Sequence, residues 1–203
     1  MRLLFDSDVF CKLGVSGMLP EAAGVLGTQI SECGRLPALP HMLRRGKLAT
    51  TYGAAACAAL LTISDAMQAI PPPDSGWLDR LTAVHDIDPG EALLFATAAQ
   101  DRSLVFTGDK RALLALKQFP AFTSALHGRI VVIEAILLAL CERLGHAEVR
   151  RRLGPLTAID KTLMVCFSPG SPDPRPALGD YYRALASEVQ PLMLWDLPSG
   201  EAA

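Results

Sequence analysis

The stretch Asp86–Leu114 reads DIDPGEALLFATAAQDRSLVFTGDKRALL and predicts a helix, a strand and a second helix in succession. Asp88 is a suitable N-cap for the first helix, Pro89 suits its first position, and Glu91 stands where it can close a capping box. The apolar run Leu104–Phe106 is short and flanked by polar residues, which is typical of a strand covered on both faces. This order of elements indicates an α/β fold with parallel strands.

The rest of the chain continues this alternation. Apolar segments at Arg2–Phe5 and Gly128–Ile133 predict two more strands. The alanine-rich segment His41–Ile70 predicts helix, with a break expected near Gly46 or Gly53. We therefore expect a sheet whose strands are separated by helices.

The sequence also suggests how the chain is divided. We expect the core domain at residues 1–140 and a C-terminal helical extension at residues 141–203. Within the extension, residues 168–176 form a proline-rich connector without helix, and a last helix is expected at Leu178–Gln190. The segment Arg35–Pro40 is expected to be extended, because prolines near both of its ends disfavour helix.

Composition excludes several classes of protein. Hydrophobic residues make up 50% of the 203 residues and charged residues 20%, which excludes a disordered chain. The net charge of −2 gives no global attraction for nucleic acid. Such a partner would need a local basic patch, for which the candidates are Arg44, Arg45, Lys47, Arg150, Arg151 and Arg152.

Cysteine usage and hydropathy indicate the compartment. The five cysteines are widely spaced without a C-x-x-C pair, which argues against a disulfide framework or a zinc site and favours a reducing compartment. Asp6 comes too early for a signal peptide, and no uninterrupted apolar run approaches the roughly 18 residues of a membrane span. We therefore expect a cytoplasmic protein without membrane association.

Acidic residues stand at corresponding places in the predicted fold. Asp6 follows the first strand, Asp109 follows the strand at Leu104–Phe106, and Glu91 begins the helix before that strand. Because equivalent ends of parallel strands share one edge of a sheet, we expect these three side chains to converge. Clustered carboxylates repel one another unless a cation neutralises them, and Mg²⁺ or Mn²⁺ prefers oxygen ligands. A metal site of this kind activates water and stabilises phosphodiester oxygens.

Each acid also has a purely structural interpretation. Glu91 can close a capping box, Asp109 can cap a helix at Lys110–Leu116, and Asp8 or Ser7 can cap the first helix. The coincidence of three acids at one edge favours the metal site over three independent caps.

Three motifs resemble those of PIN-domain nucleases in order and spacing. They are LFDSDVF at Leu4–Phe10, GEA with ATA within Gly90–Ala98, and LVFTGDK at Leu104–Lys110. The resemblance covers roughly residues 1–135 and implies a three-layer α/β/α sandwich with a central, mainly parallel sheet. It also implies a ribonuclease that uses Mg²⁺ or Mn²⁺ to cleave single-stranded or structured RNA.

The resemblance implies roles for individual residues. Asp6 matches the first metal-binding acid of the family, and Ser7 matches the small hydroxyl residue beside it. Glu91 matches an acid at the head of the later helix, and Thr107 with Asp109 matches the closing T-x-D motif. By this resemblance the three acids bind the metal, and Ser7 and Thr107 orient them.

The chain departs from the family at one position. Where the family usually has a glutamate at the head of a helix, this chain has His41–Lys47, which contains no carboxylate. Asp8 stands where the family often has asparagine and is the most suitable substitute metal ligand. The departure supports an alternative, a catalytically inactive PIN-like module that binds RNA or protein.

A second alternative is a phosphatase. Asp6-x-Asp8 after one strand, with Asp109 after a later one, also resembles the haloacid-dehalogenase phosphatases, in which the first aspartate is a nucleophile. Against this interpretation, no glycine follows Asp8, and Glu91 would have no role.

Partners follow from the same resemblance. Many PIN-domain toxins are held inactive by an antitoxin, so the resemblance implies a toxin-like component with an antitoxin-like protein as its partner. The segment Leu178–Leu197 is expected to cover an edge of the sheet, to complete a homodimer, or to dock a partner protein.

Overall fold

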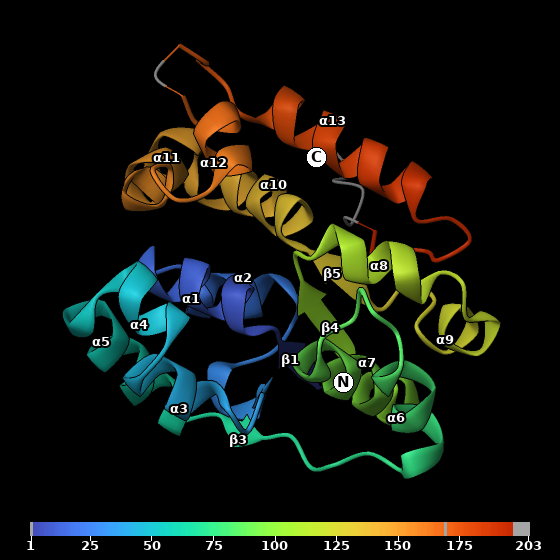
Figure 1. The fold of residues 1–203 in the computed structure, drawn as a ribbon. Helices are drawn as coiled ribbons and strands as arrows, with labels where there is room; N and C mark the ends of the chain where they lie inside the picture. The colour runs from blue at the N-terminus through green and yellow to red at the C-terminus, as the bar shows by residue number, and fades with distance from the viewer. Residues whose placement is uncertain (1, 169, 197–203) are drawn as a thin grey trace.

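The computed structural model describes residues 2–168 and 170–196, and its centre is a five-stranded sheet (Figure 1). The strands are β1 (Leu3–Phe5), β2 (Gly34–Arg35), β3 (Gln68–Ala69), β4 (Leu104–Thr107) and β5 (Ile130–Val132). They lie in the order β3-β2-β1-β4-β5, and each neighbouring pair is parallel. The predicted α/β class and parallel sheet are confirmed.

Helices cover both faces of the sheet, which gives the expected three layers. On one side, α7 (Pro89–Asp101) contacts β1 and β4, and α6 (Ser75–Thr82) and α9 (Pro120–Ala125) pack against α7. The other side carries α1 (Ser7–Val15), α2 (Leu19–Val25) and α10 (Ile133–Leu144) (Figure 1). α8 (Lys110–Leu116) follows β4 directly, at the position predicted for that helix. The strand order runs from β1 to β3 in one direction and then continues with β4 and β5 on the other side of β1. Because crossovers between parallel strands are almost always right-handed, this reversal places helices on both faces of the sheet.

Three helices lie between β2 and β3. They are α3 (Leu39–Arg44), α4 (Lys47–Tyr52) and α5 (Ala54–Asp65); a single 3₁₀ turn, η1 (Ile30–Glu32), precedes β2. The breaks occur at both predicted glycines, Gly46 with φ 99° and Gly53 with φ 80°. Both φ values are positive, which glycine adopts at little cost. The prediction that Arg35–Pro40 is extended is wrong at its end, because Pro40 lies in the first turn of α3, where a missing N–H is tolerated.

The C-terminal extension is helical, as expected. It contains α11 (His146–Leu153), η2 (Gly154–Leu156), α12 (Lys161–Cys166) and α13 (Arg175–Glu188), and α13 packs along α10 (Figure 1). α10 continues beyond residue 140 to Leu144, so the predicted boundary falls inside a helix of the core. The predicted connector at 168–176 is shorter than expected, because α13 begins at Arg175 with Pro176 in its first turn.

The end of the described chain returns to the sheet. Leu194 forms a parallel bridge with Ile130 of β5, and the Trp195 amide donates to the Ile130 carbonyl at 2.8 Å. The Gly128 amide donates to the Met193 carbonyl at 2.9 Å. The prediction that this segment covers an edge of the sheet is confirmed up to residue 196; Leu197 lies outside the described residues.

The core is centred on β1 and β4. Every residue of both strands is buried, and the rings of Phe5 and Phe106 lie 5.5 Å apart across the pair. All five cysteines are free and buried, in agreement with the expectation that they form no disulfide framework. Within residues 2–168 and 170–196, no helix has the length and apolar character needed to cross a membrane.

Replacing Phe106 by alanine is expected to lower the free energy of unfolding by roughly 3–5 kcal/mol, because a fully buried ring is removed and a cavity remains. Urea unfolding measures this loss. The control is Tyr181→Ala, at a side chain that is 41% exposed, for which a change below about 0.5 kcal/mol is expected. Equal losses in the two variants would contradict the central position of Phe106.

Candidate metal centre

Asp6, Glu91 and Asp109 line one open cavity of about 930 Å³. The cavity lies at the carboxyl ends of β1 and β4, which are neighbours in the sheet with Phe5 opposite Phe106. The Asp6 amide donates to the Phe106 carbonyl at 2.9 Å, so the chain leaves both strands side by side. The predicted convergence of the three acids on one edge is confirmed.

Glu91 closes the capping box that the sequence predicts. The Asp88 amide donates to Glu91 Oε2 at 2.8 Å, and the Glu91 amide donates to Asp88 Oδ1 at 2.8 Å. This reciprocal pair uses one oxygen of the buried Glu91 carboxylate and leaves Oε1 outside the cap. Asp88 also lines the cavity, although sequence reasoning gave it only the role of a helix cap.

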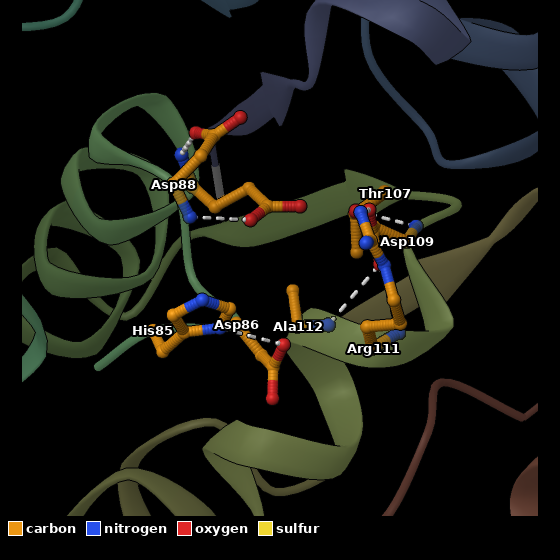
Figure 2. Close-up of polar contacts among 8 residues, drawn as sticks. His85, Asp86, Asp88, Thr107, Asp109, Arg111 and Ala112 are labelled. Carbon is orange, nitrogen blue, oxygen red and sulfur yellow. Dashed lines mark hydrogen bonds and ion pairs between the residues drawn. The ribbon is translucent and has the colours of Figure 1, made fainter.

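Asp109 likewise caps a helix. Its Oδ1 accepts hydrogen bonds from the amides of Arg111 at 2.8 Å and Ala112 at 3.1 Å, which begins α8 (Figure 2). The Arg111 guanidinium lies 3.5 Å from Oδ2. The buried Thr107 hydroxyl accepts a hydrogen bond from the Asp109 amide at 3.3 Å. Thr107 therefore positions the backbone of Asp109, in line with its predicted orienting role.

Asp6 differs from the other two acids because its side chain makes no capping bond. It stands at the N-cap of α1 with an extended backbone, yet its side chain forms no capping hydrogen bond. The Ser7 amide is the backbone group that stabilises its charged form. The neighbouring Ser7 is buried, and its hydroxyl lies 3.9 Å from the Met42 thioether sulfur. Ser7 is thus directed towards the segment His41–Lys47, where the expected glutamate is missing. Met42 itself lines the cavity.

Asp8, the predicted substitute ligand, is already paired with a cation. Lys12 Nζ lies 2.6 Å from Asp8 Oδ2 and 2.5 Å from Asp160 Oδ2. Burial lowers the pKa of Lys12, but Asp8 and Asp160 outweigh this effect and the pKa is raised, so Lys12 is charged. Sequence reasoning missed Lys12 and Asp160. The i, i+4 spacing of Asp8 and Lys12 on one helix was a local signal for their pairing, whereas Asp160 comes from the distant C-terminal extension.

The basic residues proposed as phosphate contacts fall into two groups. Arg44, Arg45 and Lys47 are exposed at the end of α3 and the start of α4, and Lys47 lines the cavity. The second group is engaged within the fold. Arg151 and Arg152 both pair with Glu148, Arg152 also pairs with Glu21, and Arg150 donates to the Ser171 carbonyl.

His85 does not join the cavity wall. Its side chain is 98% exposed and lies 3.3 Å from the Asp86 carboxylate (Figure 2). Arg111 is the basic residue that lines the cavity beside Asp109.

Burial and the charges of neighbouring carboxylates raise the pKa values of Asp6 and Glu91. Burial, followed by the charge of Asp8, raises the pKa of Asp6 to about 7 against the lowering effect of the Ser7 amide, and Asp88 and Asp109 raise it further. Burial also raises the pKa of Glu91 to about 7, because it outweighs the hydrogen bond from the Asp88 amide, and the charges of Asp88, Asp109 and Asp6 raise the pKa further. The cavity therefore disfavours the charged form of both groups unless a cation enters.

The carboxylate oxygens at the cavity suit a divalent ion that keeps several water ligands better than an ion that is coordinated only by protein atoms. Within residues 2–168 and 170–196, no three His, Cys, Asp or Glu side chains form a ready ligand set for one metal ion. However, Mg²⁺ commonly binds through one or two carboxylates and keeps several waters. Asp6 makes no capping bond, and Glu91 has one oxygen outside its cap. The residues present therefore fit Mg²⁺ or Mn²⁺ with a partly aqueous shell.

The metal-free protein is expected to lose stability as the pH rises from about 4 to about 7. In this window the carboxyls of Asp6 and Glu91 hold protons in the folded chain and lose them in the unfolded chain, so ionisation favours unfolding. Urea unfolding at pH 5 and pH 8 with a chelator should show a fall of roughly 1–3 kcal/mol, after allowance for screening by cavity water. Asp6→Asn should reduce this fall. An unchanged pH dependence in Asp6→Asn, relative to the exposed control Asp65→Asn, would contradict the raised pKa of Asp6.

Comparison with protein-family models, with curated proteins and with solved structures found no match to this chain. A functional proposal therefore has to be built from the fold and from the side chains that line the cavity.

Proposed function

We propose that this chain is a metal-dependent ribonuclease that hydrolyses phosphodiester bonds of single-stranded RNA in the cavity at the ends of β1 and β4. The observation that carries the proposal is the convergence of Asp6, Glu91 and Asp109 on that cavity. Burial and mutual repulsion keep the pKa values of Asp6 and Glu91 near 7, which favours entry of a cation. The resemblance of these residues to PIN-domain motifs points to the same chemistry.

The metal would be held by the chain's own carboxylates. Asp6 is the principal ligand in this proposal, with Glu91 and Asp109 as the second and third acids. A bound Mg²⁺ or Mn²⁺ neutralises these acids, orients the phosphodiester and lowers the pKa of a water molecule. Thr107 fixes the Asp109 backbone, and the two capping arrangements hold Glu91 and Asp109 in place before the substrate arrives.

Basic and aromatic side chains at the cavity suit a single RNA strand. Lys47 from α4 and Arg111 from α8 line the cavity on different elements, where they can contact phosphates on either side of the acids. Tyr52 also lines it and offers an aromatic ring on which an unpaired base can stack. These residues supply the local positive charge that a chain with a net charge of −2 requires.

Two further parts of the proposal concern location and partners. The five free, buried cysteines suit a reducing compartment, and we place the protein in the cytoplasm. An antitoxin-like protein partner remains a prediction from the resemblance, and a homodimer remains a prediction from the segment Leu178–Leu197.

Wild-type protein is expected to cleave a mixed single-stranded RNA pool in Mn²⁺, and Asp6→Asn is expected to lose at least about a hundredfold in rate, because metal catalysis supplies several kcal/mol. Gel analysis of the RNA and calorimetric titration of Mn²⁺ measure cleavage and binding. Asp65→Asn, an exposed acid on α5, is the control expected to match wild type. Intact RNA and no Mn²⁺ binding at millimolar concentration would refute the proposal, and phosphatase activity without RNA cleavage would favour the dehalogenase-like alternative.

Glu91→Gln and Asp109→Asn separate metal binding from helix capping. Glutamine can replace glutamate in a capping box, and asparagine is as good an N-cap as aspartate, so both variants should keep their helix starts. We expect both to fold with a free energy of unfolding within about 1 kcal/mol of wild type and to lose Mn²⁺ affinity and RNA cleavage. Unchanged cleavage in both variants would show that these two acids act only as caps.

The non-catalytic alternative is favoured by one observation. Met42 presents a thioether to Ser7 in the segment where the resembled nucleases carry a glutamate. We expect Met42→Glu to tighten Mn²⁺ binding about tenfold, or ~1.4 kcal/mol, because it adds a carboxylate to the cavity wall. Met42→Gln is the uncharged control. If Met42→Glu alone cleaves RNA, the wild-type chain is a binding module rather than a nuclease.

A further inference from the structure

Lys12 places a positive charge inside the acidic cavity. It lies on α1, one turn after Asp8, and its side chain is only 16% exposed. Its Nζ atom contacts Asp8 Oδ2 at 2.6 Å and Asp160 Oδ2 at 2.5 Å. Asp160 is itself fixed, because its other oxygen caps α12 by accepting a hydrogen bond from the Leu163 amide at 2.9 Å. The Asp160 carboxylate is therefore held in place beside the ammonium group, and the Asp8 carboxylate reaches the same nitrogen from one turn away on α1.

The spacing of the two oxygens suits a divalent ion. Both lie within 2.6 Å of one nitrogen atom. Ca²⁺ binds oxygen ligands at roughly 2.3–2.6 Å, and the smaller Mg²⁺ binds them at roughly 2.0–2.1 Å. A divalent ion at the position of Nζ would thus reach both oxygens after little or no movement of the chain.

The surroundings of Lys12 also favour a cation. A smaller cavity of about 60 Å³ adjoins Lys12 and is lined by three acids, Asp8, Glu134 and Asp160. The main cavity is lined by five acids, Asp6, Asp8, Asp88, Glu91 and Asp109, against three basic residues, Lys12, Lys47 and Arg111. Without the Lys12 charge, the acids that line the two cavities would lose the positive charge that they share. A divalent cation from solution is the simplest replacement for that charge.

We propose that Lys12 takes the place of one divalent metal ion, so that loss of its charge creates one additional metal site between Asp8 and Asp160. The inference deepens the proposed function and rests on it for the separate ion held near Asp6. It also gives the C-terminal extension a part in the site, because Asp160 and the cavity-lining Ile159 both belong to that extension.

The test counts metal ions bound per chain. Mn²⁺ is titrated into the full chain at pH 8, and free Mn²⁺ is measured by electron paramagnetic resonance. Lys12→Gln is expected to bind one more Mn²⁺ than wild type. Lys12→Arg keeps the charge and should bind the wild-type number, as should Lys161→Gln, which removes an exposed charge one residue from Asp160. The double variant Lys12→Gln with Asp160→Asn should lose the additional ion.

Each outcome separates this inference from the proposed function. Equal Mn²⁺ numbers in Lys12→Gln and wild type overturn the role of Lys12, whereas one ion in wild type still supports the nuclease. No ion in wild type and one in Lys12→Gln support the role of Lys12 and refute the metal-dependent nuclease. Circular dichroism checks that each variant folds. Lys12→Met, which keeps most of the aliphatic chain, is the second variant if Lys12→Gln does not fold, and an unchanged ion number in it likewise overturns the inference.

Discussion

The pairing of β1 with β4 brings together two parts of the chain that are far apart in sequence and fixes the position of the acids. Both strands are buried along their whole length, and Phe5 and Phe106 contact each other across the pair. Burial of a side chain of this size contributes roughly 1.5–3 kcal/mol. This apolar contact holds Asp6 and Asp109 at the same edge of the sheet, although the two charges repel each other.

The acids show that a helix cap and a functional group can be the same residue. Glu91 and Asp109 each accept backbone hydrogen bonds at the start of a helix, an arrangement typically worth about 0.5–2 kcal/mol. The caps fix these carboxylates at the cavity and offset part of the repulsion between them. Asp6 forms no capping bond, and the Ser7 amide offsets only part of the cost of burying its charge. This difference makes Asp6 the acid with the most to gain from a bound cation.

The sequence was most informative where the signals are local. The capping box at Asp88, the apolar run of β4 and the helix after Asp109 were all predicted, because each depends on residues within a few positions of one another. β3 was not predicted, since Gln68 and Ala69 are both exposed and show no apolar pattern. The contacts of Lys12 with Asp160 and of Ser7 with Met42 join distant segments, and such contacts become visible only when the fold is known.

The return of the C-terminal segment to β5 has a consequence for self-assembly. An uncovered strand at the edge of a sheet has unpaired N–H and C=O groups that can form hydrogen bonds with another protein chain, which is a common route to aggregation. Here the segment that contains Leu194 occupies the β5 edge, and the opposite edge is the two-residue strand β3. The sheet therefore presents little backbone for intermolecular pairing. Within residues 2–168 and 170–196, helix surfaces therefore offer more to another copy, or to a different protein, than extension of the sheet does.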